Sequence, residues 1–210
     1  GHVTGVQTCA LPILAGGRDM MDRLRRDPAA LSIAIYGIGS INHVALAGAV
    51  RAAGGDARRL KIVAYASASE AVPALIGGHV DVVVAPVSNL MAQVRSGGIR
   101  IIALTAPRRL GGVLANVPTW REQGIEAVVS SWRGVIGARG LKPAQVAWWE
   151  QALDAAARSD EWKAELERNF QEPDARRGAE FRAFLGAEYE RLKGVLTDLG
   201  LARPVAVTPR

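Results

Sequence analysis

The chain has 210 residues, which corresponds to one or two domains, and its 49% hydrophobic and 22% charged residues are ordinary for a globular protein. No window of the sequence approaches the run of about 18 apolar residues that crosses a bilayer. The formal net charge is +6, but the arginines are scattered and no nucleic-acid-binding motif accompanies them. The composition therefore disfavours a nucleic-acid partner, and its modest positive field favours small anions.

The first segment of the chain, residues 1–13, differs from the remainder. It holds the single cysteine, Cys9, and lacks the basic start and unbroken apolar run of a secretory leader. Its stretch VTGVQTCALPI resembles an in-frame translation of a widely used sequencing-adapter primer. We therefore expect a non-native leader that packs into no core and that stands in place of the natural N-terminus and any signal peptide. A genuine disordered leader is the alternative.

Apolar strands and helices alternate from residue 18 to residue 123. Strand 80–85, VDVVVA, is nearly all apolar, as in a sheet that is covered on both faces. The alternation predicts an α/β fold with a parallel sheet and right-handed crossovers. The predicted elements are helix 18–26, strand 31–36, helix 43–55, strand 60–65, a short helix around Pro73, strand 80–85, a helix after Pro86, strand 99–105 and a short helix over 118–123.

The pattern changes at residue 126. One long strand is predicted over 126–138, and helices follow from Lys142 onward without another strand. The last helix has apolar residues at steps of three and four and ends at Gly200. Such helices need a sheet to cover, so we expect an exposed apolar patch where that sheet would lie.

The stretch GIGSINH is the first candidate site, because a strand leads into a glycine turn and then a helix. Gly37 and Gly39 allow a ligand to approach the backbone. The free N–H groups of the helix start, with the Ser40 hydroxyl and the Asn42 amide, predict an anion site. A dinucleotide motif is disfavoured because its third glycine is absent. The alternative is a tight turn without a ligand.

Two further stretches follow neighbouring strands. In YASASEA, the hydroxyls of Ser67 and Ser69 can donate to a ligand, whereas Glu70 either favours the helix start or orients a ligand or water. In APVSN, Ser88 adds a hydroxyl after the third strand. All of these residues lie at the carboxyl ends of strands, where open α/β sheets bind ligands.

The long strand adds Arg133, which can pair bidentately with a carboxylate. Its neighbour Trp132 is expected in the core. Residues for catalysis are not found, because no supported Ser-His-Asp set and no phosphate-binding loop is present. The histidines lack metal-ligand spacing. We therefore expect no enzyme, no metal and no cofactor.

Several stretches together resemble one known family over about residues 17–201. They are GIGSINH, YASASEAVPALIGGHVDVVV, RIIALTAPRRL, NVPTWREQG, SWRGVIGARGLKPAQV, EWKAELERN and FLGAEYERLKGVLTDLGL. They look like the substrate-binding proteins of tripartite tricarboxylate transporters. GGHVDV and NVPTWREQG, in this order and spacing, are specific, and the final helix is most similar to the tricarboxylate-type branch.

The resemblance implies a periplasmic-binding-protein-like, two-lobed clamp with parallel-rich sheets, flanking helices and an incomplete first lobe. It implies this division of the chain: leader 1–13, remnant helix and crossover 14–30, second lobe 31–127, the C-terminal part of the first lobe 128–203, and tail 204–210. The protein would be a periplasmic monomer that captures a di- or tricarboxylate such as citrate and delivers it to a membrane permease.

In the family, main-chain amides and small hydroxyls hold the carboxylates. That role carries over onto Gly39, Ser40, Ser67, Ala68 and Ser69. SASE replaces a glycine run of the family here, and the added Cβ atoms narrow the expected pocket. Two alternatives stay open: a nucleotide- or phosphate-binding α/β enzyme that uses the GIGS loop, and a fragment without function.

Overall fold

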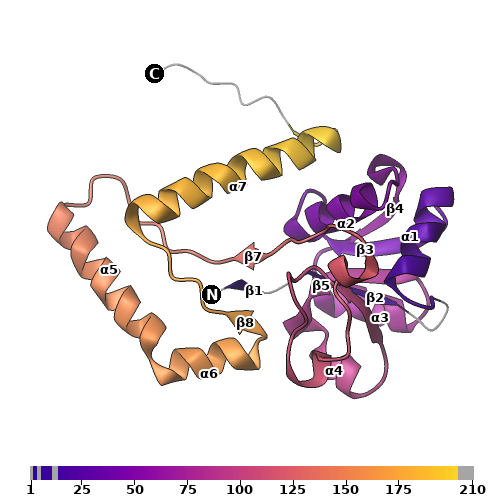
Figure 1. Ribbon diagram of the computed structural model, residues 1–210, viewed down its shortest axis with the longest axis horizontal. Coiled ribbons are helices and arrows are strands. Elements are labelled where there is room, and N and C mark those ends of the chain that lie inside the picture. Colours follow the sequence, from indigo (N-terminus) through magenta and orange to yellow (C-terminus); the bar gives the residue numbers. More distant parts are fainter. Residues whose placement is uncertain (1, 4–5, 11–13, 203–210) are drawn as a thin grey trace.

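The computed structural model describes residues 2–3, 6–10 and 14–202, which form an α/β unit and a helical arm (Figure 1). In the α/β unit the elements are β2 (Val6–Ala10), α1 (Gly17–Arg26), β3 (Ser32–Tyr36), α2 (Ile41–Ala52), β4 (Lys61–Tyr65), α3 (Ala68–Ile76), β5 (Val82–Pro86), α4 (Met91–Arg95) and β6 (Arg100–Leu104), with short 3-10 turns at Ala57–Arg59, Val87–Asn89, Gly112–Leu114 and Arg121–Gln123. In the arm they are β1 (His2–Val3), β7 (Ser131–Trp132), α5 (Pro143–Arg158), α6 (Asp160–Arg168), β8 (Gln171–Glu172) and α7 (Gly178–Asp198).

The sheet of the α/β unit has five strands in the order β4-β3-β5-β2-β6. β3 is parallel to both β4 and β5, and Tyr36 lies opposite Tyr65 at the ends of β3 and β4. β2 is antiparallel to β5 and to β6, so those two strands are parallel to each other with β2 between them. The four apolar strands predicted from the sequence are confirmed, and so is their common direction.

The expectation that residues 1–13 pack nowhere is wrong for the backbone of β2. Its register pairs Val6 with Pro86 on one side and Gln7 with Leu104 on the other. The physical reason is that each neighbouring strand presents a row of N–H and C=O groups, which must be paired when they are buried. Any extended backbone satisfies them, whatever its side chains. The two side chains that best test the leader prediction, Leu11 and Ile13, lie outside the described residues.

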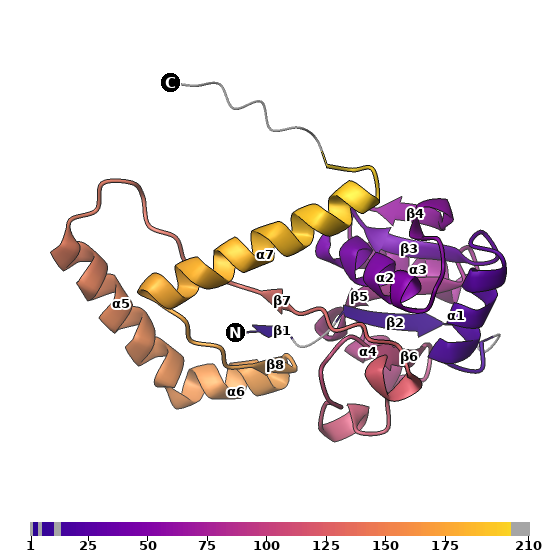
Figure 2. The same cartoon turned by 45° about the horizontal axis from the view of Figure 1, so that its top comes forward.

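Apolar side chains of alternate strand residues fill a core on each face of the sheet. Ile33 and Ile35 belong to the core that α1 and α2 cover, and Ala34 belongs to the one that α3 and α4 cover. Figure 2 shows these helices against the sheet. Met20 and Leu24 of α1 are fully buried in the first core. This helix, expected as a remnant apart from the lobe, is therefore an integral part of the α/β unit.

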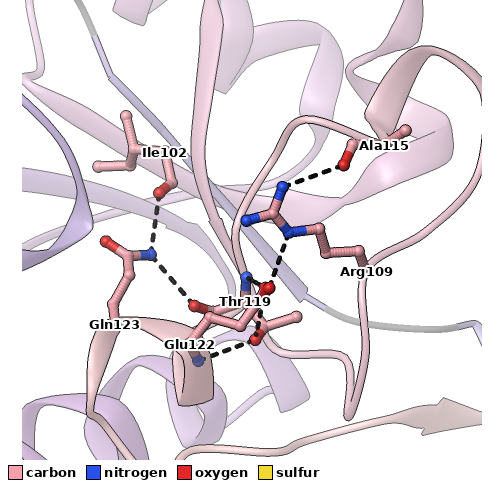
Figure 3. A network of polar contacts seen from close by, with 6 residues as sticks. All are labelled: Ile102, Arg109, Ala115, Thr119, Glu122 and Gln123. Carbon is pink, nitrogen blue, oxygen red and sulfur yellow. Dashed lines mark hydrogen bonds and ion pairs between the residues drawn. The ribbon is translucent and has the colours of Figure 1, made fainter.

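The stretch NVPTWREQG forms a structural network (Figure 3). The Thr119 N–H donates to Glu122 Oε2 at 2.8 Å, and the Glu122 N–H donates to Thr119 Oγ1 at 3.1 Å, a reciprocal cap of the short turn. Arg109 Nε donates to Glu122 Oε1 at 2.8 Å. Gln123 Nε2 donates to the carbonyl of Ile102 in β6 at 3.2 Å. These contacts fasten the loop after β6 to the sheet, so the motif serves the fold.

The arm differs from the sequence prediction at its start. In place of one strand over 126–138, only Ser131–Trp132 form β7, which pairs with β1. Gly134 and Gly137 interrupt the apolar run and give a strand no side chains to pack. The predicted helices from Lys142 onward are confirmed as α5, α6 and α7. The expectation of no further strand is wrong, because β8 lies between α6 and α7 and pairs with β1.

The expected exposed apolar surface is present on the arm. Beyond Ser131, Leu166 is the single buried residue among those described. Exposed large apolar side chains gather here, with Trp148 exposed by 60% and Trp149 by 51%. The remaining ones on the arm are Val135, Ile136, Val146, Leu153, Trp162, Tyr189 and Leu201. The arm therefore holds its shape with little core of its own.

A matched pair of glycine substitutions tests the packing of the α/β unit. A Cβ on Gly17 would lie 2.6 Å from Trp120 Cζ3, so Gly17→Ala should destabilise the fold by about 1–3 kcal/mol through overpacking. A Cβ on Gly48, inside α2, has no neighbour within 4 Å, and Gly48→Ala should stabilise by about 0.5–1 kcal/mol. Urea unfolding followed by circular dichroism measures both. Equal effects of the two changes would contradict this packing.

Candidate ligand-binding site

The candidate residues come together at one edge of the sheet. β2 enters the sheet from the side of β1 and the arm, and β3, β4 and β5 run in the opposite direction, so their carboxyl ends face the arm (Figure 2). Two loops leave this edge side by side, the glycine loop (residues 37–40) and the serine loop (residues 66–70), because Tyr36 and Tyr65 are paired. The turn Val87–Asn89 follows β5 at the same edge.

The glycine loop makes a turn that needs positive φ angles. Gly37 has φ 76° and Gly39 has φ 78°, in the left-handed region that favours glycine. Ser40 is the N-cap of α2, and its Oγ accepts from the His43 N–H at 3.5 Å. The loop therefore delivers the chain to the amino end of a twelve-residue helix, where anions are stabilised.

His43 accepts a hydrogen bond from the Gly39 N–H, one of the donors expected to bind a ligand. The Gly39 N–H donates to His43 Nδ1 at 3.1 Å, so that N–H is already paired. Burial lowers the pKa of His43, because a charged ring would lose its hydration. The neutral ring with a free Nδ1 acceptor is the form that fits this bond. The sequence places His43 in the helix among its neighbours, but its bond to Gly39 depends on the turn geometry.

Asn42 is buried, with 4% of its surface exposed, and its Oδ1 has no hydrogen-bond partner among the described atoms. A buried acceptor without a partner costs about 1–3 kcal/mol. The sequence-based role of its amide as a donor to a ligand stays a prediction.

The serine loop begins helix α3 at Ala68, with Ser67 as its N-cap. The hydroxyls of Ser67 and Ser69 lie 2.7 Å apart and share a hydrogen bond. Glu70 Oε2 accepts from the Ala66 N–H at 3.3 Å. The carboxylate thus pairs with the loop's own backbone, which gives Glu70 a local structural function.

The other two candidates are placed differently. Ser88 is exposed in the turn after β5, at the same edge as the two loops. Arg133 follows β7 in the arm and donates to Ser131 Oγ at 2.8 Å and to the Trp132 carbonyl at 3.1 Å. Its described contacts are thus with its own strand, and its role toward a ligand stays a prediction.

A cavity of about 310 Å³ lies in the arm, away from the three loops. Its lining residues are Val128, Ser130, Trp132, Arg176, Phe184, Glu188 and Arg191. Both of its guanidinium groups have carboxylate partners: Arg191 pairs with Glu188 at 2.8 Å and Arg176 with Asp174 at 3.0 Å. No pattern in the sequence pointed to this cavity, and its two guanidinium groups are already neutralised by carboxylates.

A model of the tripartite tricarboxylate transporter family receptors (TctC) matches residues 8–201. The chain belongs to this family. The match includes nearly all of the α/β unit and the arm, and it begins inside β2. A search among curated proteins gave no match.

Solved structures share the fold of this TctC family member. Rpa4515 of R. palustris, solved with adipate, is 21% identical with a TM-score of 0.80, and the match covers 95% of this chain and 66% of that one. MatC (Rpa3494) from Rhodopseudomonas palustris, with bound malate, is 22% identical with a TM-score of 0.75 and coverages of 92% and 66%. A TctC solute binding protein from Polaromonas, without ligand, is 20% identical with a TM-score of 0.73 and coverages of 93% and 67%. The chain thus spans about two thirds of the length of these proteins.

None of the described helices of this family member is long and apolar enough to cross a membrane. Within the described ranges, no group of three His, Cys, Asp or Glu side chains is arranged to hold a metal ion.

The lowered pKa of His43 predicts a pH dependence of stability. The stabilisation from the neutral ring is complete above the unfolded-state pKa of about 6.5 and is lost as the pH falls from there through the lower folded-state pKa. Between pH 7.5 and 5, the free energy of unfolding measured in urea should therefore fall more steeply for the unsubstituted chain than for His43→Gln, whose side chain cannot titrate. Parallel profiles for the two proteins would contradict the buried neutral ring.

Proposed function

We propose that this chain is the greater part of an extracytoplasmic solute-binding protein, which captures a small di- or tricarboxylate in the periplasm and delivers it to a membrane permease. One observation carries the proposal. The glycine loop and the serine loop, each at the amino end of a helix, lie side by side at a sheet edge that faces the arm. A ligand at this edge lies between two bodies of the protein, as in a clamp.

The chemistry of the edge suits a carboxylate. The amino ends of α2 and α3 favour negative charge, and the hydroxyls of Ser40, Ser67 and Ser69 can donate to ligand oxygens. Adipate and malate, which two of the solved relatives hold, are both dicarboxylates. The Cβ atoms of the serine loop narrow the space, which favours a slender dicarboxylate over citrate.

Binding without turnover is part of the proposal. Ser40 Oγ lies 3.5 Å from the backbone nitrogen of His43, and the ring Nδ1 already accepts from Gly39. The ring therefore has no free base within reach of the serine hydroxyl in this geometry. The rival function, a nucleotide- or phosphate-binding enzyme, is an outcome of the experiments below.

A chimaera provides the test of the clamp. It joins this chain to the third of the adipate-bound R. palustris protein for which the chain has no counterpart. Ligand at a hundred times its dissociation constant stabilises a folded protein by about 2.7 kcal/mol. Thermal melts are recorded with malate, adipate, citrate, ATP and inorganic phosphate. They should shift clearly for the chimaera with a carboxylate and hardly at all for the 210-residue chain.

Two results would contradict that account. A saturable shift of the 210-residue chain at micromolar carboxylate would mean that this chain alone holds a complete site and needs no further part of a clamp. A shift of the chimaera with ATP or phosphate, and with no carboxylate, would support the rival function.

Serine substitutions locate the site in the chimaera. Ser40→Ala and Ser69→Ala should each weaken carboxylate binding, because a hydrogen bond to a charged group is worth about 1.5–3 kcal/mol, or roughly ten- to a hundredfold in affinity. Ser96→Ala is the control, because Ser96 follows α4 and donates to Gln93 within its own turn. Calorimetric titration with the acid and with its diamide completes the test. Equal affinity for the acid and for its diamide would contradict a site that recognises carboxylates.

A further inference from the structure

The glycine loop has few contacts of its own. The Ser40 N–H donates to the Gly37 carbonyl at 3.3 Å, the Gly39 N–H to His43 at 3.1 Å, and the His43 N–H to Ser40 Oγ at 3.5 Å. The bonds of 3.3 and 3.5 Å are long, and a Cβ placed on Gly37 would have no neighbour within 4 Å. Two glycines also give the loop much conformational freedom in the absence of outside contacts. Something beyond the loop is needed to hold its N–H groups in one orientation.

The C-terminal end of α7 supplies an outside contact, since it crosses beside α2 (Figure 1). The position that a Cβ would take on Gly39 lies 3.7 Å from Leu196 Cδ2, its single neighbour within 4 Å. Val195 and Leu199, one helical turn apart, pack against the core that contains α2. Leu196 is thus held against the loop by the anchoring of its own helix.

Polar contacts fix the same end of α7. Asp198 forms an ion pair with Arg51 in the last turn of α2, and its carbonyl accepts from Arg58 Nε. A guanidinium beside the last carbonyls of a helix also complements the helix dipole. Contacts near both ends of α2 therefore hold α7 in place over the loop.

The opposite half of α7 lies in the arm. Phe181 and Phe184 meet Trp132 edge-to-face, with ring centroids 6.0 and 5.5 Å apart. One continuous helix of 21 residues thus joins the aromatic cluster of the arm to the glycine loop.

We propose that Leu196 is a positioning residue for the glycine loop. It lies beside Gly39 and holds the amino end of α2 in the geometry that receives a carboxylate, so that the loop is ordered only while the arm is in place. The value of this order for binding rests on the proposed function. The order itself does not, and it is measurable without a ligand.

Hydrogen exchange on the 210-residue chain tests the contact. In Leu196→Ala, amides of residues 37–43 should exchange several-fold faster, while peptides from the serine loop and from β3 and β5 keep their natural rates. Leu192→Ala is the matched control, a half-buried leucine one turn earlier on α7. Leu196→Met, which conserves side-chain volume, should restore slow exchange.

Two outcomes overturn the proposal. Natural exchange rates of residues 37–43 in Leu196→Ala would show that Leu196 does not order the loop. Equal acceleration in all peptides, or in Leu192→Ala as well, would show a general loss of stability and no specific contact.

The chimaera separates this proposal from the proposed function. Leu196→Ala should lower its carboxylate affinity several-fold, and Leu192→Ala should leave that affinity unchanged. Faster loop exchange in a chimaera that binds no carboxylate would sink the proposed function and leave the loop contact standing. Faster loop exchange with unchanged carboxylate affinity would overturn the positioning role.

Discussion

The α/β unit depends on the hydrogen bonds that β2 makes along both of its sides. Without β2, β5 and β6 would each leave a row of buried backbone N–H and C=O groups unpaired. β6 would also lose its hydrogen bonds to the sheet, because β2 is its neighbour there. These bonds come from the backbone, so they place little demand on the residues between Val6 and Ala10. A segment that looks foreign in sequence therefore forms an interior strand of the sheet, between β5 and β6. The direction of β2 also turns the carboxyl ends of the parallel strands toward the arm.

Local pattern was sufficient to predict the parallel strands and most helices. The run VDVVVA, for example, is apolar at every position that both cores require. Pairing was not predictable, because the partner of β2 lies far along the chain and backbone hydrogen bonds leave no trace in composition. The prediction of one long strand over 126–138 was wrong for a related reason. Apolar residues alone do not make a strand where glycines interrupt them and only two residues find a partner.

The candidate site was predictable as far as its loops. Strand ends followed by Gly37, Gly39, Ser67 and Ser69 identify the edge without any tertiary information. The structural functions of His43 and Glu70 could not be predicted from the sequence, because each side chain accepts a hydrogen bond from the loop that precedes its helix. The position of Leu196 beside the glycine loop was even less predictable from the sequence. Its apolar spacing marks it as a helix-face residue, and only the crossing of α7 over α2 connects it with Gly39.

The position of α7 also has a consequence for the order in which the protein is assembled during synthesis. Strands β3, β4 and β5 pair over short separations and form early. The glycine loop is made well before α7 and meets Leu196 only after that helix has been synthesised. Before α7 is made, the glycine loop at the edge of the sheet lacks its neighbour Leu196. The edge of the sheet that carries the glycine loop is thus completed by a helix that is made after all of its strands.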